Sequence, residues 1–97
     1  MKQDLVEDYK FIVNEVNQRY ELHVDDHVAF IDFRLNNNKI YLTHTEVPKG
    51  LEGQGIGSLL VKQALTDIQQ REMTLIPLCP FVVSYIKRHP EWQVLTQ

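Results

Sequence analysis

The residues best suited to chemistry lie in a glycine-rich segment near the middle of the chain. Gly53, Gly55 and Gly57 alternate there with larger residues, between an expected strand and an apolar stretch with helical spacing. Alternating glycines let backbone N–H groups curl toward a bulky anion, and the following helix adds unpaired N–H groups and a positive dipole end. The pattern therefore favours an anion site, most often for phosphate. The alternative is that these glycines only end the strand and allow close helix packing.

Two common phosphate-binding motifs do not fit this segment. A Walker-type loop places a lysine after its last glycine, whereas Gly57 is followed by Ser58. A dinucleotide fingerprint would need its third glycine at Ser58, and the chain is too short for the rest of that fold. A different phosphate ligand is therefore expected.

The stretch from Glu52 to Gly57 resembles the acyl-CoA-binding signature of the GNAT superfamily of N-acetyltransferases, Arg/Gln-x-x-Gly-x-Gly/Ala. Gly55 and Gly57 match its two small positions, while Glu52 departs from the first. The flanking segments His44-Thr45-Glu46-Val47, Pro77-Leu78-Cys79-Pro80-Phe81-Val82 and Arg88-His89-Pro90-Glu91 look like the small single-domain branch of that superfamily. That branch carries a cysteine near the acyl group, and the resemblance extends roughly over residues 10 to 95.

The resemblance implies how the co-substrate acetyl-CoA would be held. Its diphosphate would lie on the glycine segment, and its pantetheine arm would pair with the backbone of the strand before it, from Thr45 to Val47. The residues expected to bind the coenzyme are Thr45, Val47, Glu52, Gly53, Gln54, Gly55, Ile56, Gly57 and Ser58.

Acyl transfer to an amine needs a base for the amine and an acid for the departing thiolate. His44 and Glu46 share one face of their expected strand, so either can be the base, directly or through water. The alternative is a solvated strand face. By resemblance, Tyr85 takes the place where many GNAT enzymes keep a tyrosine that protonates the thiolate; otherwise its ring packs a helix onto the sheet.

Cys79 is a further candidate because Pro80 and the apolar residues after it have helical spacing. Proline is favoured at the first helical position, which makes Cys79 the residue capping a helix N-terminus. Reactive cysteines are often found in that setting. A functional Cys79 either takes the acetyl group covalently or lies beside the thioester. The alternative is a buried cysteine that acts as a small apolar side chain.

Periodicity predicts the elements that must position these residues. Alternating apolar residues and short polar turns indicate an antiparallel meander, with a hairpin turn at 36–38. The expected strands cover 11–13, 20–24, 28–35 and 39–47. The tail around Trp92, Val94 and Leu95 is expected to pack back as a short strand or a cover.

The second half is predicted to be a parallel strand–helix–strand unit formed by 39–47, about 54–71 and 74–78. Its glycine turn and Cys79 should then lie at the same edge of the sheet, where open α/β sheets bind ligands. Pro77 cannot donate to a ladder, so the two parallel strands should part near this edge. The fold class predicted is α/β (α+β), a truncated GNAT fold: an antiparallel meander leading into a parallel β-α-β unit with splayed strands and a C-terminal helix.

The composition limits which binding partners and which cellular compartment are expected. The net charge of −3 gives no basic field for nucleic acid, and no apolar run approaches the ~20 residues that span a bilayer. No secretory signal is seen, and the single cysteine fits a reducing compartment. Histidine and cysteine spacing gives no metal-ligand pattern. We expect a cytoplasmic monomer or weak dimer with one acetyltransferase-like domain over 1–97, in which 1–9 is frayed or a short helix.

The predicted function is transfer of acetyl from acetyl-CoA to an amine. Little room exists for the two helices that line the acceptor site in larger relatives, so the site should be open. An open site suits a protein or peptide amine, or completion by a second subunit. The rival hypothesis is a non-catalytic acyl-CoA-binding or interaction module, which Glu52 and the missing acceptor helices favour.

Overall fold

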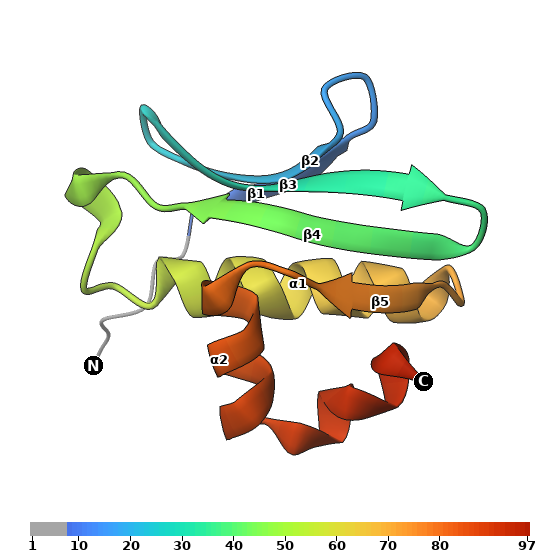
Figure 1. Ribbon diagram of the computed structural model, residues 1–97. Coiled ribbons are helices and arrows are strands. Elements are labelled where there is room, and N and C mark those ends of the chain that lie inside the picture. Colours follow the sequence, from blue (N-terminus) through green and yellow to red (C-terminus); the bar gives the residue numbers. More distant parts are fainter. Residues whose placement is uncertain (1–7) are drawn as a thin grey trace.

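Five strands form one mixed sheet in which each strand pairs with its neighbour in sequence, in the order β1-β2-β3-β4-β5 (Figure 1). The computed structural model describes residues 8–97, so most of the expectation for residues 1–9 lies outside the described part. The first three pairings are antiparallel, and β4 and β5 are parallel. The strands are β1 (Lys10–Asn14), β2 (Arg19–Val24), β3 (His27–Asn36), β4 (Lys39–Glu46) and β5 (Thr74–Pro77).

The turns of the meander form where the sequence offers residues that tolerate a left-handed backbone. Gln18, Asp25 and Asn37 have φ angles of 54°, 55° and 60° in the three successive hairpin turns. Asparagine and aspartate adopt this conformation more readily than other side chains because their short polar groups bond locally. The predicted meander is therefore confirmed, including its hairpin turn after β3.

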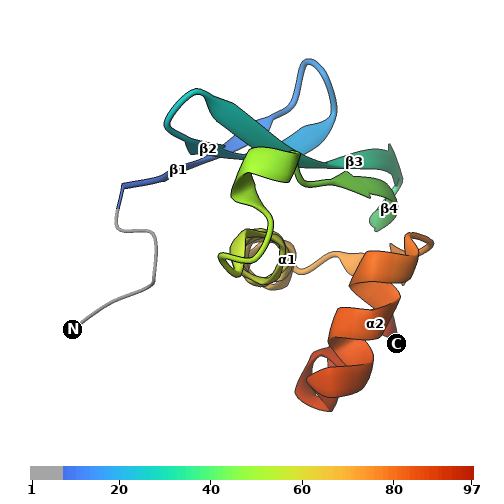
Figure 2. The same cartoon turned by 90° about the vertical axis from the view of Figure 1, so that its left-hand side faces the viewer.

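Helix α1 (Ile56–Gln70) connects β4 to β5 and covers one face of the sheet (Figure 2). Its buried stripe has the spacing of one helix face: Ile56, Leu60, Ala64 and Ile68 are each at most 1% exposed. Across the layer they meet the inward side chains of β2, β3 and β4, including Leu22. Tyr20 ties the two layers together, because its hydroxyl donates to Asp67 Oδ2 at 2.8 Å.

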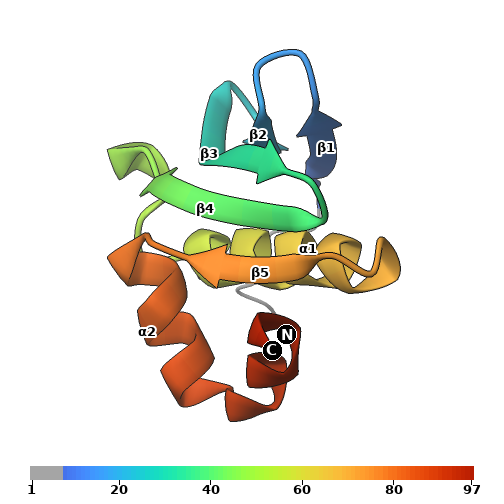
Figure 3. The same cartoon turned by 45° about the vertical axis from the view of Figure 1, so that its right-hand side comes forward.

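The parallel pairing covers the whole of the short β5 but only the first half of β4 (Figure 3). Their register ends at Leu42 and Pro77, and the Leu42 carbonyl accepts the last bonds, from the amides of Leu78 and Cys79 at 3.0 and 3.1 Å. Beyond this point β4 continues to Glu46 without a partner in β5. Because the chain turns away at Pro77, the predicted splay between these strands is confirmed.

Helix α2 (Pro80–Arg88) follows β5, with Cys79 as its N-cap as predicted. The tail forms a 3₁₀ helix, η2 (Pro90–Thr96), which packs beside α2 and β5 as a cover. Of its apolar residues, Leu95 is buried, Trp92 is half-buried against the core and Val94 is exposed. A shorter 3₁₀ helix, η1 (Lys49–Leu51), lies between β4 and α1.

The two faces of the sheet differ in what covers them. Figures 1 and 2 show α1 and α2 on the same side, and within residues 8–97 no helix covers the opposite face, here called the open face. None of the helices described between 8 and 97 is long and apolar enough to cross a membrane.

Candidate functional site

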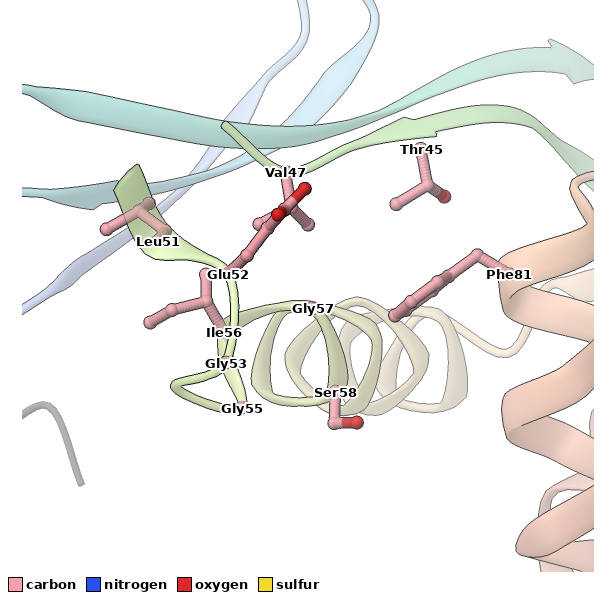
Figure 4. Close-up of a pocket in the computed structure, with 10 residues that line it drawn as sticks. All are labelled: Thr45, Val47, Leu51, Glu52, Gly53, Gly55, Ile56, Gly57, Ser58 and Phe81. Carbon is pink, nitrogen blue, oxygen red and sulfur yellow. The ribbon is translucent and has the colours of Figure 1, made fainter. Parts of the chain in front are cut away.

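A cavity of about 390 Å³ opens between the end of β4 and the start of α1 (Figure 4). Nearly all of its lining comes from one continuous segment, residues 45–58, and one side chain comes from α2. The lining residues are Thr45, Val47, Leu51, Glu52, Gly53, Gly55, Ile56, Gly57, Ser58 and Phe81.

The floor of the cavity is the turn that begins α1. Gly53 and Gly55 have positive φ angles of 83° and 73°, a conformation that costs other residues free energy. Gly55 is the N-cap of α1, and the first helical bond runs from the Leu59 amide to the Gly55 carbonyl at 3.0 Å. No side chain caps this end and no acidic residue lies in the first turn. The amides at the helix start are therefore free to bind an anion.

The strand side of the cavity is formed by alternate residues of β4 and the residue after it. Thr45 and Val47 face the cavity, whereas His44 and Glu46 point the other way because side chains alternate along a strand. This end of β4 is also the part without a partner in β5. A slender ligand can therefore lie along an unpaired strand edge that leads directly to the free amides.

Cys79 lies just beyond the cavity lining, at the end of β5. Its thiol donates a hydrogen bond to Thr45 Oγ1 at 3.0 Å, so one threonine touches both the cavity and the cysteine. Cys79 is only 4% exposed. The predicted placement of the glycine turn and Cys79 at one sheet edge is confirmed, and the Thr45 hydroxyl connects them.

The comparison with protein families agrees with this geometry. A family model described as GCN5-related N-acetyl-transferase matches residues 19–95. The chain belongs to this family. Acetyl-CoA is the general co-substrate of GNAT enzymes, and the acyl group is transferred to an amine. The observed splay of β4 and β5 beside free amides at the start of α1 is the truncated GNAT fold expected from the sequence.

His44 and Glu46, the predicted base candidates of this GNAT chain, form a pair on the open face. The His44 Nε2 atom lies 3.0 Å from Glu46 Oε1, and both side chains are more than half exposed. They are next to the strand edge that the cavity uses, but on the other side of the sheet. The pair is accessible to a large molecule approaching from the open face.

The open face of this GNAT sheet carries polar side chains that contact one another across neighbouring strands. Arg19 lies 3.7 Å from the ring centroid of Phe30 and 3.4 Å from Asp32, while Glu21 accepts hydrogen bonds from Asn14 and His23. Burial alone would raise the pKa of Glu21, but the bonds from His23 and Asn14 outweigh it and lower the pKa. Glu21 therefore stays a carboxylate although it is only 8% exposed.

Tyr85 lies one turn along α2 from the cavity-lining Phe81 and does not line the cavity. It is 5% exposed, and its ring centroid is 4.4 Å from that of His89. Burial, aided by the charge of Glu91, raises the pKa of Tyr85, so the phenol keeps its proton at neutral pH. Its role as a proton donor to a thiolate stays a prediction.

Two lining residues were not among the predicted coenzyme-binding residues, and one predicted coenzyme-binding residue lies outside the lining. Leu51 and Phe81 line the cavity, although sequence spacing marked Phe81 only as part of an apolar helix. Gln54 does not line it; its side-chain amide donates to the Gly50 carbonyl at 3.3 Å and braces the turn. The signal for Phe81 was its position two residues after Cys79, which places both at the same end of α2.

Proposed function

We propose that this protein transfers the acetyl group of acetyl-CoA to the amine of a protein or peptide. One observation carries the proposal: the start of α1 presents uncapped amides, left-handed glycines and no carboxylate in its first turn, beside an unpaired end of β4. That combination suits a diphosphate joined to a long amide-containing arm. GNAT membership supports the acyl-transfer chemistry.

In this proposal the chain holds the coenzyme mainly through its backbone. The amides from Gly53 to Ser58 bind the diphosphate, and the free edge of β4 from Thr45 to Val47 pairs with the amides of the pantetheine arm. Bound there, the coenzyme supplies an activated thioester. Backbone contacts do not depend on side-chain identity, so they survive the departure of Glu52 from the family pattern.

The protein's own groups then manage the protons. His44 or Glu46 removes a proton from the acceptor ammonium, directly or through water, which frees the nitrogen lone pair to attack the thioester carbonyl carbon. The tetrahedral intermediate collapses, the C–S bond breaks, and the departing thiolate takes a proton from Tyr85 or from solvent. The attacking nitrogen releases its remaining extra proton to solvent, which leaves the neutral amide, and a Tyr85 that has donated its proton regains one from solvent. Cys79 either receives the acetyl group before the amine does, or lies beside the thioester as part of the pocket wall.

The open face supports a bulky, cationic acceptor. The His44–Glu46 pair is exposed, and no described element between 8 and 97 encloses it. The exposed Glu46 carboxylate on this face would attract an ammonium group. A lysine side chain or N-terminus on a peptide reaches such a flat face more easily than it reaches a deep cleft.

The test measures binding and transfer separately. Coenzyme binding is measured by calorimetry, with amide shifts mapped over residues 54–58; CoA release is measured with a lysine peptide and with a polyamine. Amine-dependent CoA release together with shifts at Gly55 to Ser58 would support the proposal. Millimolar coenzyme that leaves these amides unchanged would overturn it. Intact mass after incubation, compared with Cys79→Ala, distinguishes a covalent acetyl-cysteine from direct transfer.

A specific observation favours a second candidate, a non-catalytic acyl-CoA-binding module. The Glu52 carboxylate points into the cavity (Figure 4), where family members carry arginine or glutamine in the pattern quoted above. Coenzyme binding with no transfer to any amine would favour this second function.

A further inference from the structure

Phe81 is the one cavity-lining residue that does not come from the segment 45–58. It is in the first turn of α2, and Figure 4 shows its ring extending from α2 toward Gly57, with Thr45 on the strand above. The side chain is 38% exposed, so this large apolar ring is not locked into the core. A ring in such a position has room to swing toward solvent.

The Phe81 ring packs against the backbone of Gly57. A Cβ atom added at Gly57 would lie 2.5 Å from Phe81 Cζ, with the neighbouring ring carbons at 3.1 and 3.3 Å, so the tip of the ring occupies the space of the missing side chain. Unlike Gly53 and Gly55, Gly57 has no positive φ angle. Its backbone conformation therefore does not need glycine, whereas the close approach of Phe81 leaves no room for a side chain there.

Thr45 and Phe81 connect the cavity to Cys79. The Cys79 thiol is bonded to Thr45 and nearly buried, and it does not line the cavity. Thr45 lines the cavity and accepts the hydrogen bond of that thiol, and Phe81 lines the cavity from the first turn of the helix that Cys79 caps. A group that extends through the cavity from the amides at the start of α1 toward Cys79 would therefore meet Thr45 and this ring.

We propose that Phe81, seated on Gly57, is a gate that controls access from the coenzyme cavity to Thr45 and Cys79 and limits the width of the acyl group admitted. The closed position is held by the contact between the ring tip and the Gly57 backbone. Opening swings the ring toward solvent and breaks that contact. The limit on acyl width rests on the proposed function. The control of access to Cys79 does not depend on it.

The first test uses Cys79 as a built-in reporter, because it is the only cysteine of the chain. The rate of alkylation by iodoacetamide is followed by intact mass for wild type, Phe81→Ala, Gly57→Ala and Leu78→Ala. Leu78 is the matched control, since it is exposed and adjacent to Cys79 but does not line the cavity. Phe81→Ala removes the ring, and the added methyl group of Gly57→Ala displaces the ring from its contact with residue 57.

Both cavity variants are expected to alkylate about tenfold faster than wild type, because the open fraction sets the rate. Leu78→Ala should stay within about twofold of wild type, since a surface truncation leaves the gate closed. An unchanged rate in Phe81→Ala or in Gly57→Ala would overturn the proposal, and so would an equal rise in Leu78→Ala. Thermal melts exclude unfolding as the cause, and Phe81→Leu, which keeps most of the apolar volume, should give an intermediate rate.

The second test addresses acyl width. Turnover of acetyl-CoA and butyryl-CoA is compared in wild type and Phe81→Ala, and the butyryl-to-acetyl ratio should rise about tenfold in the variant, as methylene-sized pocket changes do. A ratio that does not change would overturn the width limit. Absence of any turnover, with the alkylation rates as expected, would instead count against the proposed transferase and leave the gate standing.

Discussion

Glu52 is the residue at which the electrostatics of the cavity are least favourable to a diphosphate. Its carboxylate lines the same cavity as the free amides of α1, and no salt bridge to it is formed among residues 8–97. A carboxylate this close to the amides repels a bound anion, and added salt weakens the repulsion. We therefore expect this side chain to weaken coenzyme binding without removing the proposed backbone contacts.

We predict that Glu52→Gln binds CoA about three- to tenfold more tightly than wild type at low salt, because one repulsive charge is lost. The gain should shrink as salt is added. Calorimetric titration at two salt concentrations measures both effects, with Glu72→Gln beyond the other end of α1 as the matched charge control. Weaker binding in Glu52→Gln would mean that the carboxylate accepts hydrogen bonds from the coenzyme.

Gly55 is a residue whose backbone alone explains its identity. Nothing lies within 4 Å of a Cβ atom added at Gly55, so there is space for a side chain. The constraint is the φ angle of 73°, which other residues rarely adopt. We predict that Gly55→Ala lowers the free energy of unfolding by about 1–2 kcal/mol and weakens CoA binding, while Gly55→Asn recovers part of both because asparagine tolerates the left-handed region. Urea unfolding and calorimetry check this, and a Gly55→Ala variant as stable as wild type would contradict it.

At the scale of elements, local chemistry predicted most of the fold. A short apolar run predicted the first meander strand and alternation predicted those that follow. Asn37 lies in the predicted hairpin turn, and α1 begins at Ile56 because the left-handed Gly55 cannot continue the helix backward. The structure of the C-terminal tail was harder to predict from the sequence. Its apolar residues suit a short strand or a cover equally well, and packing against β5 and α2, which local spacing does not encode, decides for η2.

The Tyr20–Asp67 hydrogen bond is the polar tie between β2 and α1. Burial first, and then the bond and charge of Asp67, raise the pKa of Tyr20 well above its usual range. The folded state therefore keeps the phenol proton at a pH where the unfolded chain loses it. This contribution to stability is fully present below about pH 10 and is lost as the pH rises further.

We predict that Tyr20→Phe lowers the free energy of unfolding by about 1 kcal/mol at neutral pH, the usual value of one hydrogen bond. Its stability should also fall less steeply than that of wild type between about pH 9 and 11, because the phenol no longer titrates. Urea unfolding across this range is the measurement, and Tyr41→Phe on β4 is the control. An equal alkaline slope in wild type and Tyr20→Phe would refute the assignment.

At the scale of the whole molecule, a single strand separates two kinds of surface. Successive residues of β4 face opposite sides, so Thr45 belongs to the coenzyme cavity and its neighbours His44 and Glu46 belong to the open face. Strand alternation predicts that His44 and Glu46 share one face and Thr45 lies on the other. Which face is which could not be predicted, because Ile40 and Leu42 point to the helix side and a shift in the β3–β4 register at Asp32/Phe33 reverses the alternation before His44. The contact between Gly57 and Phe81 could not be predicted either, because it depends on the angle at which α2 leaves β5, and no local pattern specifies that angle.

If coenzyme and acceptor approach β4 from opposite faces, substitutions on the two faces should separate in their kinetics. We predict that Glu46→Gln or His44→Ala lowers kcat for a lysine peptide by about 10²-fold or more, the range for loss of a general base, with CoA affinity unchanged. The variant that removes the true base should also lose the acidic limb of the pH–rate profile. Thr45→Val, on the cavity face, should instead alter the KM for acetyl-CoA, and Glu72→Gln should change neither constant. Equal effects of Glu46→Gln on both substrates would contradict the two-sided arrangement, because one face would then serve coenzyme and acceptor together.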